Sequence, residues 1–282
     1  MNRRQPGQPV EYTARLFVVA AGYVWSSHLL LLSRGSRYPN GLANRSGLVG
    51  RYMNGHSFVS AQAETDAKIY AGMNERHGLI SRQYLRCRPD QPYRRHDLRI
   101  WESNFGRQPR LRSGEGRLLL GEDLLTDWRQ RAARGAALLR AYYDVHPARE
   151  SSLTLDETAR NRWGDPLPKI DHRFDEATQA RQGATREQIL NIFRLMARAN
   201  DGKILETSFS NYLDHPGGGC RMGEDPTSSV CDSWGKTHDH ENLYVAGAPT
   251  TPTAGCTNGT LTFVALTLRA ADRIARQLGS AA

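Results

Sequence analysis

The sequence has 282 residues, of which 39% are hydrophobic and 24% are charged, and its formal net charge at pH 7 is +9. These values are typical of a globular protein with a real core, in one large domain or two ordinary ones. No run approaches the roughly 20 apolar residues of a membrane span, and no apolar core typical of an export signal follows the first arginines. We therefore expect no membrane span, and the sequence does not determine the cellular compartment.

The positive charge is scattered along the chain, and no basic run carries the interleaved aromatic residues of a nucleic-acid interface. We expect solvated surface charge and no nucleic-acid partner. The cysteines form no CxxC pair and no metal-ligand spacing, which favours buried or reduced thiols. They are Cys87, Cys220, Cys231 and Cys256.

A continuous apolar run over residues 16–22 is typical of a strand buried on both faces of a parallel sheet. Ser26–Ser27 offers an N-cap for a short helix over residues 29–32. A turn at Ala21 and Gly22 could let the backbone approach a ligand, although an ordinary strand–helix corner fits these residues equally well. No GxGxxG follows a strand, so either no dinucleotide binds or its site lies on a missing N-terminal portion.

The middle of the chain predicts a loop over residues 38–60 and an irregular stretch over 80–120, with a strand at Leu118–Leu120 inside it. A helical pattern follows over residues 123–136. Residues 137–174 look β-rich and antiparallel, with hairpin turns, as in the wall of a pocket. The strands expected there cover residues 138–143, 151–155 and 163–170.

Thr185 is the expected cap of an amphipathic helix over residues 186–199. Farther on, His215 opens a loop of three glycines, which lacks the strand and the Lys-Ser/Thr of a phosphate loop and favours a tight turn behind the histidine. His238 and His240 favour a polar turn, because no carboxylate or cysteine cluster stands at ligand spacing. We expect no metal site.

A short apolar strand, Leu243–Ala246, then ends in Gly247–Ala248, and Asn258–Gly259 opens a helix that begins near Thr260. Strand, glycine turn and helix N-terminus together form the usual cradle for an anionic or electron-rich cofactor edge. On the residues alone, His215 could be a surface-loop histidine and Asn258 a simple helix cap.

In combination these segments resemble the glucose–methanol–choline (GMC) family of flavin-dependent oxidoreductases, and most of all its bacterial branch acting on sugars, sugar acids and polyols. The match runs in order over most of the chain and is densest in about the last 70 residues. The segments that carry it are Ala20–Gly22, Pro39–Asn44, Gly47–Arg51, Trp163–Pro168, His215–Pro226, Asn242–Val245, Asn258 and Ala270–Ile274.

Members of that family are roughly twice as long and begin with an FAD-binding βαβ unit. The resemblance therefore implies that this chain is a C-terminal half of mixed α/β fold. It would combine part of a Rossmann-like parallel sheet with a substrate domain of antiparallel sheet and helices. The implied domains are residues 1–60 for the FAD-binding part, 61–210 for the substrate domain, and 211–282 for the segment returning to the FAD domain.

By the resemblance, His215 is the base that accepts the substrate's hydroxyl proton, and Asn258 lies beside it as the hydrogen-bonding partner. Gly259 stands where the family usually has proline. FAD is the implied cofactor, with the helix N-terminus near Thr260 stabilising the reduced flavin. The residues expected to contact it are Ala21, Gly22, Ala246, Gly247, Ala248, Gly259 and Thr260.

The implied function is that of a dehydrogenase oxidising the CH–OH group of a sugar, sugar acid, polyol or alcohol by hydride transfer to FAD. Electrons would pass on to a cytochrome or quinone. The FAD-binding half could be separately encoded, and we expect the chain alone to bind FAD weakly or not at all. The alternative is a non-catalytic remnant or partner subunit that keeps the fold.

Overall fold

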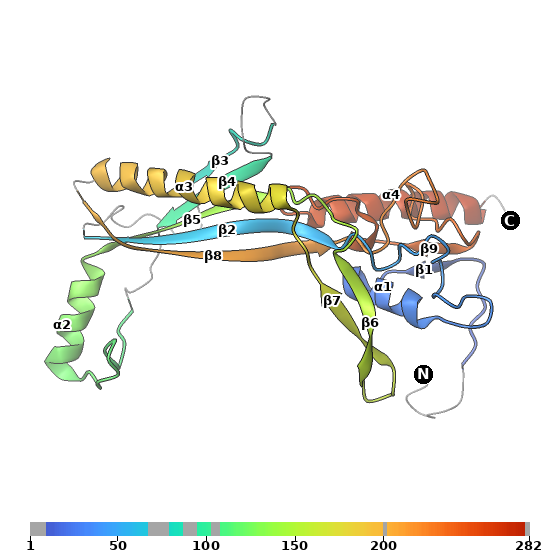
Figure 1. Ribbon diagram of the computed structural model, residues 1–282, viewed down its shortest axis with the longest axis horizontal. Coiled ribbons are helices and arrows are strands. Elements are labelled where there is room, and N and C mark those ends of the chain that lie inside the picture. Colours follow the sequence, from blue (N-terminus) through green and yellow to red (C-terminus); the bar gives the residue numbers. More distant parts are fainter. Residues whose placement is uncertain (1–9, 67–78, 87–94, 103–107, 200–201, 280–282) are drawn as a thin grey trace.

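The computed structural model describes residues 10–66, 79–86, 95–102, 108–199 and 202–279. The elements lie along one long axis, with β1, β9, α1 and α4 gathered at one end and α2 at the other (Figure 1). The first nine residues and Cys87 lie outside the described part. Within that part, no helix is both long and apolar enough to cross a membrane.

The described elements are three groups of strands and four α-helices. The strands are β1 (Phe17–Val19), β2 (Asn54–Thr65), β3 (Leu79–Ser81), β4 (His96–Glu102), β5 (Gly135–Tyr143), β6 (Ser152–Arg160), β7 (Pro166–Asp171), β8 (Ile204–Gly217) and β9 (Leu243–Val245). The helices are α1 (Gly22–Leu32), α2 (Gly121–Ala132), α3 (Glu176–Ala199) and α4 (Thr260–Gly279), with a 3-10 turn at Ala248–Thr250.

Strands β1 and β9 pair in parallel over three residues each, which confirms the expected piece of parallel sheet. Helix α1 begins directly at Gly22, so the expected cap at Ser26–Ser27 is wrong. Ala21 holds the N-cap position, and its backbone N–H donates to the Ser26 hydroxyl at 3.1 Å. The serine bonds the helix start from one turn inside it. Leu30 and Leu31 then pack into a core that includes Val245.

A five-stranded antiparallel sheet in the order β3-β4-β5-β2-β8 forms the body of the molecule, as expected for the substrate domain. Its central strand β2 starts at Asn54, so the loop expected over residues 38–60 ends too late. The strand was not expected because glycine at position 55 is typical of a turn. Here the glycine allows β2 and β8 to approach closely, since a Cβ on Gly55 would lie 2.9 Å from the Asp214 carbonyl oxygen. Strand β8 itself was not expected.

The stretch over residues 80–120 is less irregular than expected, because β3 and β4 lie in it and β4 pairs with β5 from His96 to Glu102. By contrast, Leu118–Leu120 is no strand. Only an isolated bridge joins Leu118 to Arg112, and Leu119 is buried alone just before α2. The expected helix over residues 123–136 is confirmed with earlier bounds, as α2.

Helix α3 lies along the large sheet (Figure 1), where Ile189 and Phe193 pack against residues of β2 and β5 such as Val59. The helix begins at Glu176, so the expected cap at Thr185 is wrong, and Thr185 is buried inside the helix. The first half was missed because it buries polar groups. The Gln182 amide, for example, donates to the Ser57 hydroxyl at 3.0 Å.

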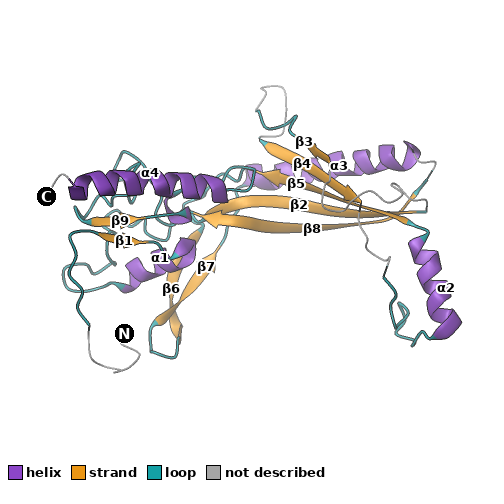
Figure 2. Ribbon diagram, turned by 180° about the vertical axis from the view of Figure 1, so that it is seen from behind, coloured by secondary structure: helices purple, strands orange, loops and turns teal. Residues whose placement is uncertain are grey.

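Strands β6 and β7 form a separate antiparallel hairpin beside α1, which confirms two of the strands expected there. Figure 2 shows β2 and β8 running from the large sheet toward the end of the molecule that holds β1 and β9. The carboxyl end of β8 and the amino end of β2 therefore meet beside the parallel pair. This junction is where the sequence places its candidate site.

Candidate active site

His215 lies at the end of β8 in the left-handed region, with φ 45°, and its side chain is 23% exposed. A non-glycine residue with positive φ is uncommon and is a frequent feature of functional sites. The conformation is supported locally, because the His215 backbone N–H donates to the Asp214 carboxylate at 2.8 Å. The imidazole is thereby presented from a fixed backbone.

His56 was not expected in the site, and it is the nearest partner of His215. The two strands set it there, because His56 of β2 pairs with Asp214 of β8. Nδ1 of His215 lies 3.2 Å from Nε2 of His56, which is completely buried. Oδ2 of Asp214 is 3.4 Å from Nδ1 of His215 and 3.9 Å from Nε2 of His56.

The segment carrying Asn258 reaches this histidine pair through its backbone. Nδ1 of His56 lies 3.1 Å from the carbonyl oxygen of Thr257, the residue before Asn258. The Asn258 side chain is exposed. Among the described residues, the structure records no hydrogen bond between the Asn258 side chain and His215. The connection between the two residues runs from the Thr257 backbone through His56 to His215.

Burial is the largest influence on His56, and it lowers the pKa of the imidazole below its usual value. The hydrogen bond with Thr257 opposes that effect, and the neighbouring His215 adds to it. The Tyr142 ring packs edge-on against His56 with its centroid 5.1 Å away. Burial thus favours the neutral form of His56.

The glycine loop behind His215 makes the tight turn that the sequence indicates. Gly218 and Gly219 have φ of 78° and 90°, and a Cβ on Gly218 would lie 2.2 Å from the Tyr52 carbonyl oxygen. The Gly218 backbone N–H donates to the carbonyl oxygen of Ala248 at 3.0 Å. The loop therefore fixes the end of β8 against the segment after β9.

Several residues expected at the cofactor surround the ends of the parallel pair. Gly22 and Gly247 follow β1 and β9 with φ of 81° and 88°, and a Cβ on Gly22 would meet nothing within 4 Å. The Ala246 N–H donates to the Val19 carbonyl oxygen at 3.0 Å, so the carboxyl ends of β1 and β9 lie side by side. Ala21 and Ala248 flank these glycines. Positive-φ glycines at adjacent strand ends leave room for close approach of a ligand.

Gly259 and Thr260 stand at the start of α4, whose first turn contains no acidic residue. A Cβ on Gly259 would lie 2.7 Å from the Phe263 ring, so glycine rather than proline suits this helix entry. The backbone N–H groups of a first helical turn lack partners within the helix. Together with the strand ends, this helix start fits the anionic edge of a flavin cofactor.

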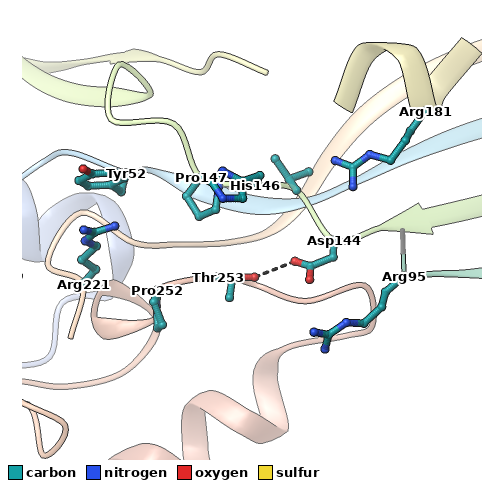
Figure 3. A pocket seen from close by; sticks show the side chains of 10 residues that line it. Tyr52, Arg95, Asp144, His146, Pro147, Arg181, Arg221, Pro252 and Thr253 are labelled. Atoms are coloured by element: carbon teal, nitrogen blue, oxygen red, sulfur yellow. Dashed lines mark hydrogen bonds between the residues drawn. The ribbon is translucent and has the colours of Figure 1, made fainter. Parts of the chain in front are cut away.

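A cavity of about 680 Å³ is lined in part by Asp144, which follows β5, and by Thr253, which lies in the segment after β9 (Figure 3). Its connection to the histidine pair is the segment after β9: Thr253 donates to the Asp144 carboxylate at 2.7 Å, and Thr257 four residues later bonds His56. The cavity walls are rich in cations. The lining residues are Tyr52, Arg95, Asp144, Val145, His146, Pro147, Arg181, Arg221, Pro252 and Thr253.

His238 and His240 lie in structured turns, as expected: Nε2 of His238 is 2.8 Å from the Ser229 hydroxyl, and Nε2 of His240 accepts from the Ala43 N–H. Within the described residues, the group whose donor atoms could surround a metal ion is instead His56, Asp214 and His215, all within 4.8 Å of one another. The sequence indicated no metal ligands there.

The three described cysteines are free and buried, as expected. Burial raises the pKa of Cys220 to about 12 and that of Cys256 to about 11, and it raises the pKa of Cys231 well above its usual value. All three are therefore protonated thiols near neutral pH, without nucleophilic character.

Comparison with known proteins gives a consistent result. Residues 147–267 match the family model described as GMC oxidoreductase. The chain is 32% identical over 269 residues to the fructose dehydrogenase large subunit of Gluconobacter japonicus, covering 94% of this chain and 48% of that protein. It is 32% identical over 276 residues to paromamine 6'-oxidase of Streptomyces fradiae, covering 95% and 46% respectively.

A solved structure of pyridoxine 4-oxidase from Mesorbium loti has the same fold, with a TM-score of 0.53 at 16% identity over 93% of this chain and 51% of that one. The chain thus spans about half the length of the proteins it matches. Sequence, motif order and fold agree: the chain belongs to the GMC oxidoreductase family.

Proposed function

We propose that this chain carries the catalytic half of an FAD-dependent dehydrogenase that oxidises the CH–OH group of a sugar, sugar acid, polyol or alcohol. The observation that carries the proposal is the placement of His215. Its partly exposed imidazole stands at the end of β8, on Asp214 and His56, beside the strand ends and helix start that fit a flavin.

Alcohol oxidation of this kind removes a proton from the hydroxyl and a hydride from the carbinol carbon. Bound FAD would supply the ring that accepts the hydride. Gly22, Gly247 and the start of α4 at Thr260 would hold it on this chain, since their backbones are open to close approach. The remaining contacts of the cofactor would come from an FAD-binding half that lies on another segment or on a separate chain.

His215 would accept the hydroxyl proton, because a neutral imidazole is a base near neutral pH. The imidazolium that results would be stabilised by the Asp214 carboxylate, whose Oδ2 is 3.4 Å from Nδ1. The exposed amide of Asn258 would hydrogen-bond the substrate oxygen. The electron pair of the broken O–H bond forms the second carbon–oxygen bond. The carbinol hydrogen leaves with both electrons of its own bond, so the product is an aldehyde or ketone.

The cavity supports a polar substrate. Its volume lies within the range usual for small-molecule sites. Arg95, Arg181 and Arg221 line it from three separate parts of the chain (Figure 3), although Arg181 also donates to Thr178 and Arg221 to the Ser228 carbonyl oxygen. Such donors suit hydroxyl oxygens or a carboxylate of a sugar or sugar acid. The electrons of the reduced cofactor would then pass to a cytochrome or quinone.

The proposal is tested by the substitution His215→Ala in the enzyme assembled with its FAD-binding half. Turnover should fall by about 10²- to 10⁴-fold, the usual contribution of a general base. His238→Ala is the matched control, because that imidazole bonds Ser229 in the same C-terminal segment. Turnover unchanged by His215→Ala, with flavin content equal in both variants, would contradict the proposed role.

A further inference from the structure

We propose that His56 is a positioning residue that fixes the proton of His215 on Nδ1 and leaves the lone pair on Nε2. The name "base" for Nε2 rests on the proposed function, whereas the tautomer is a property of this chain and can be measured without cofactor. His56 itself touches neither substrate nor cofactor in this scheme.

The argument starts at Thr257, because a carbonyl oxygen can only accept a hydrogen bond. Its partner at 3.1 Å, Nδ1 of His56, must therefore carry a proton. His56 is completely buried, and burial disfavours the charged form of an imidazole. A neutral ring with a proton on Nδ1 has its lone pair on Nε2.

That lone pair determines the state of the next ring. Nε2 of His56 accepts, so Nδ1 of His215, 3.2 Å away, must donate. The Asp214 carboxylate favours the same arrangement through its negative charge, because its Oδ2 lies 3.4 Å from Nδ1 of His215. The acceptor on His56 thus holds the proton of neutral His215 on Nδ1, since the hydrogen bond of one ring nitrogen sets the state of the other.

Nε2 of His215 is the remaining nitrogen. Nothing in the described part of the chain hydrogen-bonds it, and the side chain is partly exposed. It is therefore the atom free to accept a proton from a bound alcohol. The relay also ties the base to Asn258, because the carbonyl that begins the relay belongs to the preceding residue. A displacement of that segment would disturb both groups together.

The same three residues could instead bind a divalent cation, since their donor atoms are close enough together. In that case Nδ1 of His215 and Nε2 of His56 would both be deprotonated ligands. The hydrogen-bond relay and the metal site therefore predict opposite protonation states at one atom, His215 Nδ1. A single measurement separates them.

The experiment is proton–nitrogen NMR of the chain with ¹⁵N-labelled histidine, after treatment with a chelator, above the titration of the imidazoles. We expect His215 and His56 both with the proton on Nδ1. His56→Leu should shift His215 toward the Nε2-protonated form. His56→Gln should keep the proton on Nδ1, because the Gln carbonyl can replace the lost acceptor. His172→Leu, at a half-buried imidazole, should leave the His215 signals unchanged.

Either wild-type ring protonated on Nε2 would overturn the proposal, and this result does not depend on whether the leucine variant folds. Equimolar Zn²⁺ that removes the Nδ1 proton of His215 would overturn it in favour of a metal site. In the assembled enzyme, His56→Leu should lower kcat/KM within the range of about 10²- to 10⁴-fold of a general base, with recovery in His56→Gln. If both tautomers are as predicted but His215→Ala keeps full turnover, the proposed function is refuted and the positioning role of His56 is not.

Discussion

His56 and His215 are the same residue type on neighbouring strands, and their burial gives them different chemistry. His56 has no exposed surface and two hydrogen-bonding neighbours, whereas 23% of the His215 side chain is exposed. The first is suited to a fixed neutral state and the second to exchange of a proton. The buried thiols nearby contribute no nucleophile, because burial raises the pKa of each.

At this scale the stability of the fold should depend on pH through two imidazoles, the buried His56 and the half-buried His172. Burial lowers the pKa of His56 and of His172 below the usual 6.5. Below that pH the unfolded chain binds protons that the native chain does not, so the free energy of unfolding decreases as pH falls from about 7 toward 5. Above about pH 7 both states are neutral at these sites and the effect is absent.

Urea unfolding followed by circular dichroism between about pH 5 and 8 measures this slope. The charged or titratable groups that face His56 are Asp214, His215 and Arg99. His56→Gln removes one titrating group and should flatten the slope, whereas His146→Gln, at an exposed side chain, should leave it unchanged. An equal slope in wild type and His56→Gln would show that His56 does not titrate differently in the two states.

At the scale of the element, the turn after β8 should tolerate no side chain. Gly218→Ala combines a positive φ with a Cβ 2.2 Å from the Tyr52 carbonyl oxygen. Gly116→Ala is the matched control, because its φ of 86° is similar and nothing lies within 4 Å of the added Cβ. The conformation alone costs about 1–2 kcal/mol of stability, so Gly116→Ala should lose about that much.

Gly218→Ala should lose more, since backbone at both sides of the contact must shift. Thermal or urea unfolding of the two variants measures the difference. Equal losses would mean that only the φ angle matters and that the loop can relax away from Tyr52. A shift of the loop would also move His215, so the altered imidazole environment should be visible in the histidine NMR signals.

The same elements show what could be predicted from the sequence. Apolar patterns located β1, β5 and β9, whereas the motif order singled out His215 and Asn258 as site residues, and their roles stay a prediction. His56 was missed because it follows Asn54 and Gly55, residues typical of turns, which here allow β8 to approach closely. The first half of α3 was missed because it faces the sheet with hydrogen-bonding residues. In both places tertiary contact overrides local preference.

At the scale of the whole molecule, the end that holds the parallel pair is incompletely covered. Ala270 is the one buried residue of α4, while Leu261, Val264 and Leu268 are 81%, 49% and 64% exposed. These positions recur at helical spacing, so they form one apolar stripe. The chain spans about half the length of its relatives. We infer that an FAD-binding half covers this stripe and completes the parallel sheet.

The chain purified alone should therefore show little or no flavin absorbance, whereas the chain produced together with an FAD-binding half should co-purify with it as a yellow complex. Leu268→Lys should weaken that complex, because it places a charge within an apolar contact. Leu195→Lys is the matched control, since Leu195 is similarly exposed at 63% but lies on α3, which packs on the large sheet. Absence of flavin from both preparations would favour the non-catalytic remnant. Retention of the complex by Leu268→Lys would place the contact elsewhere on the molecule.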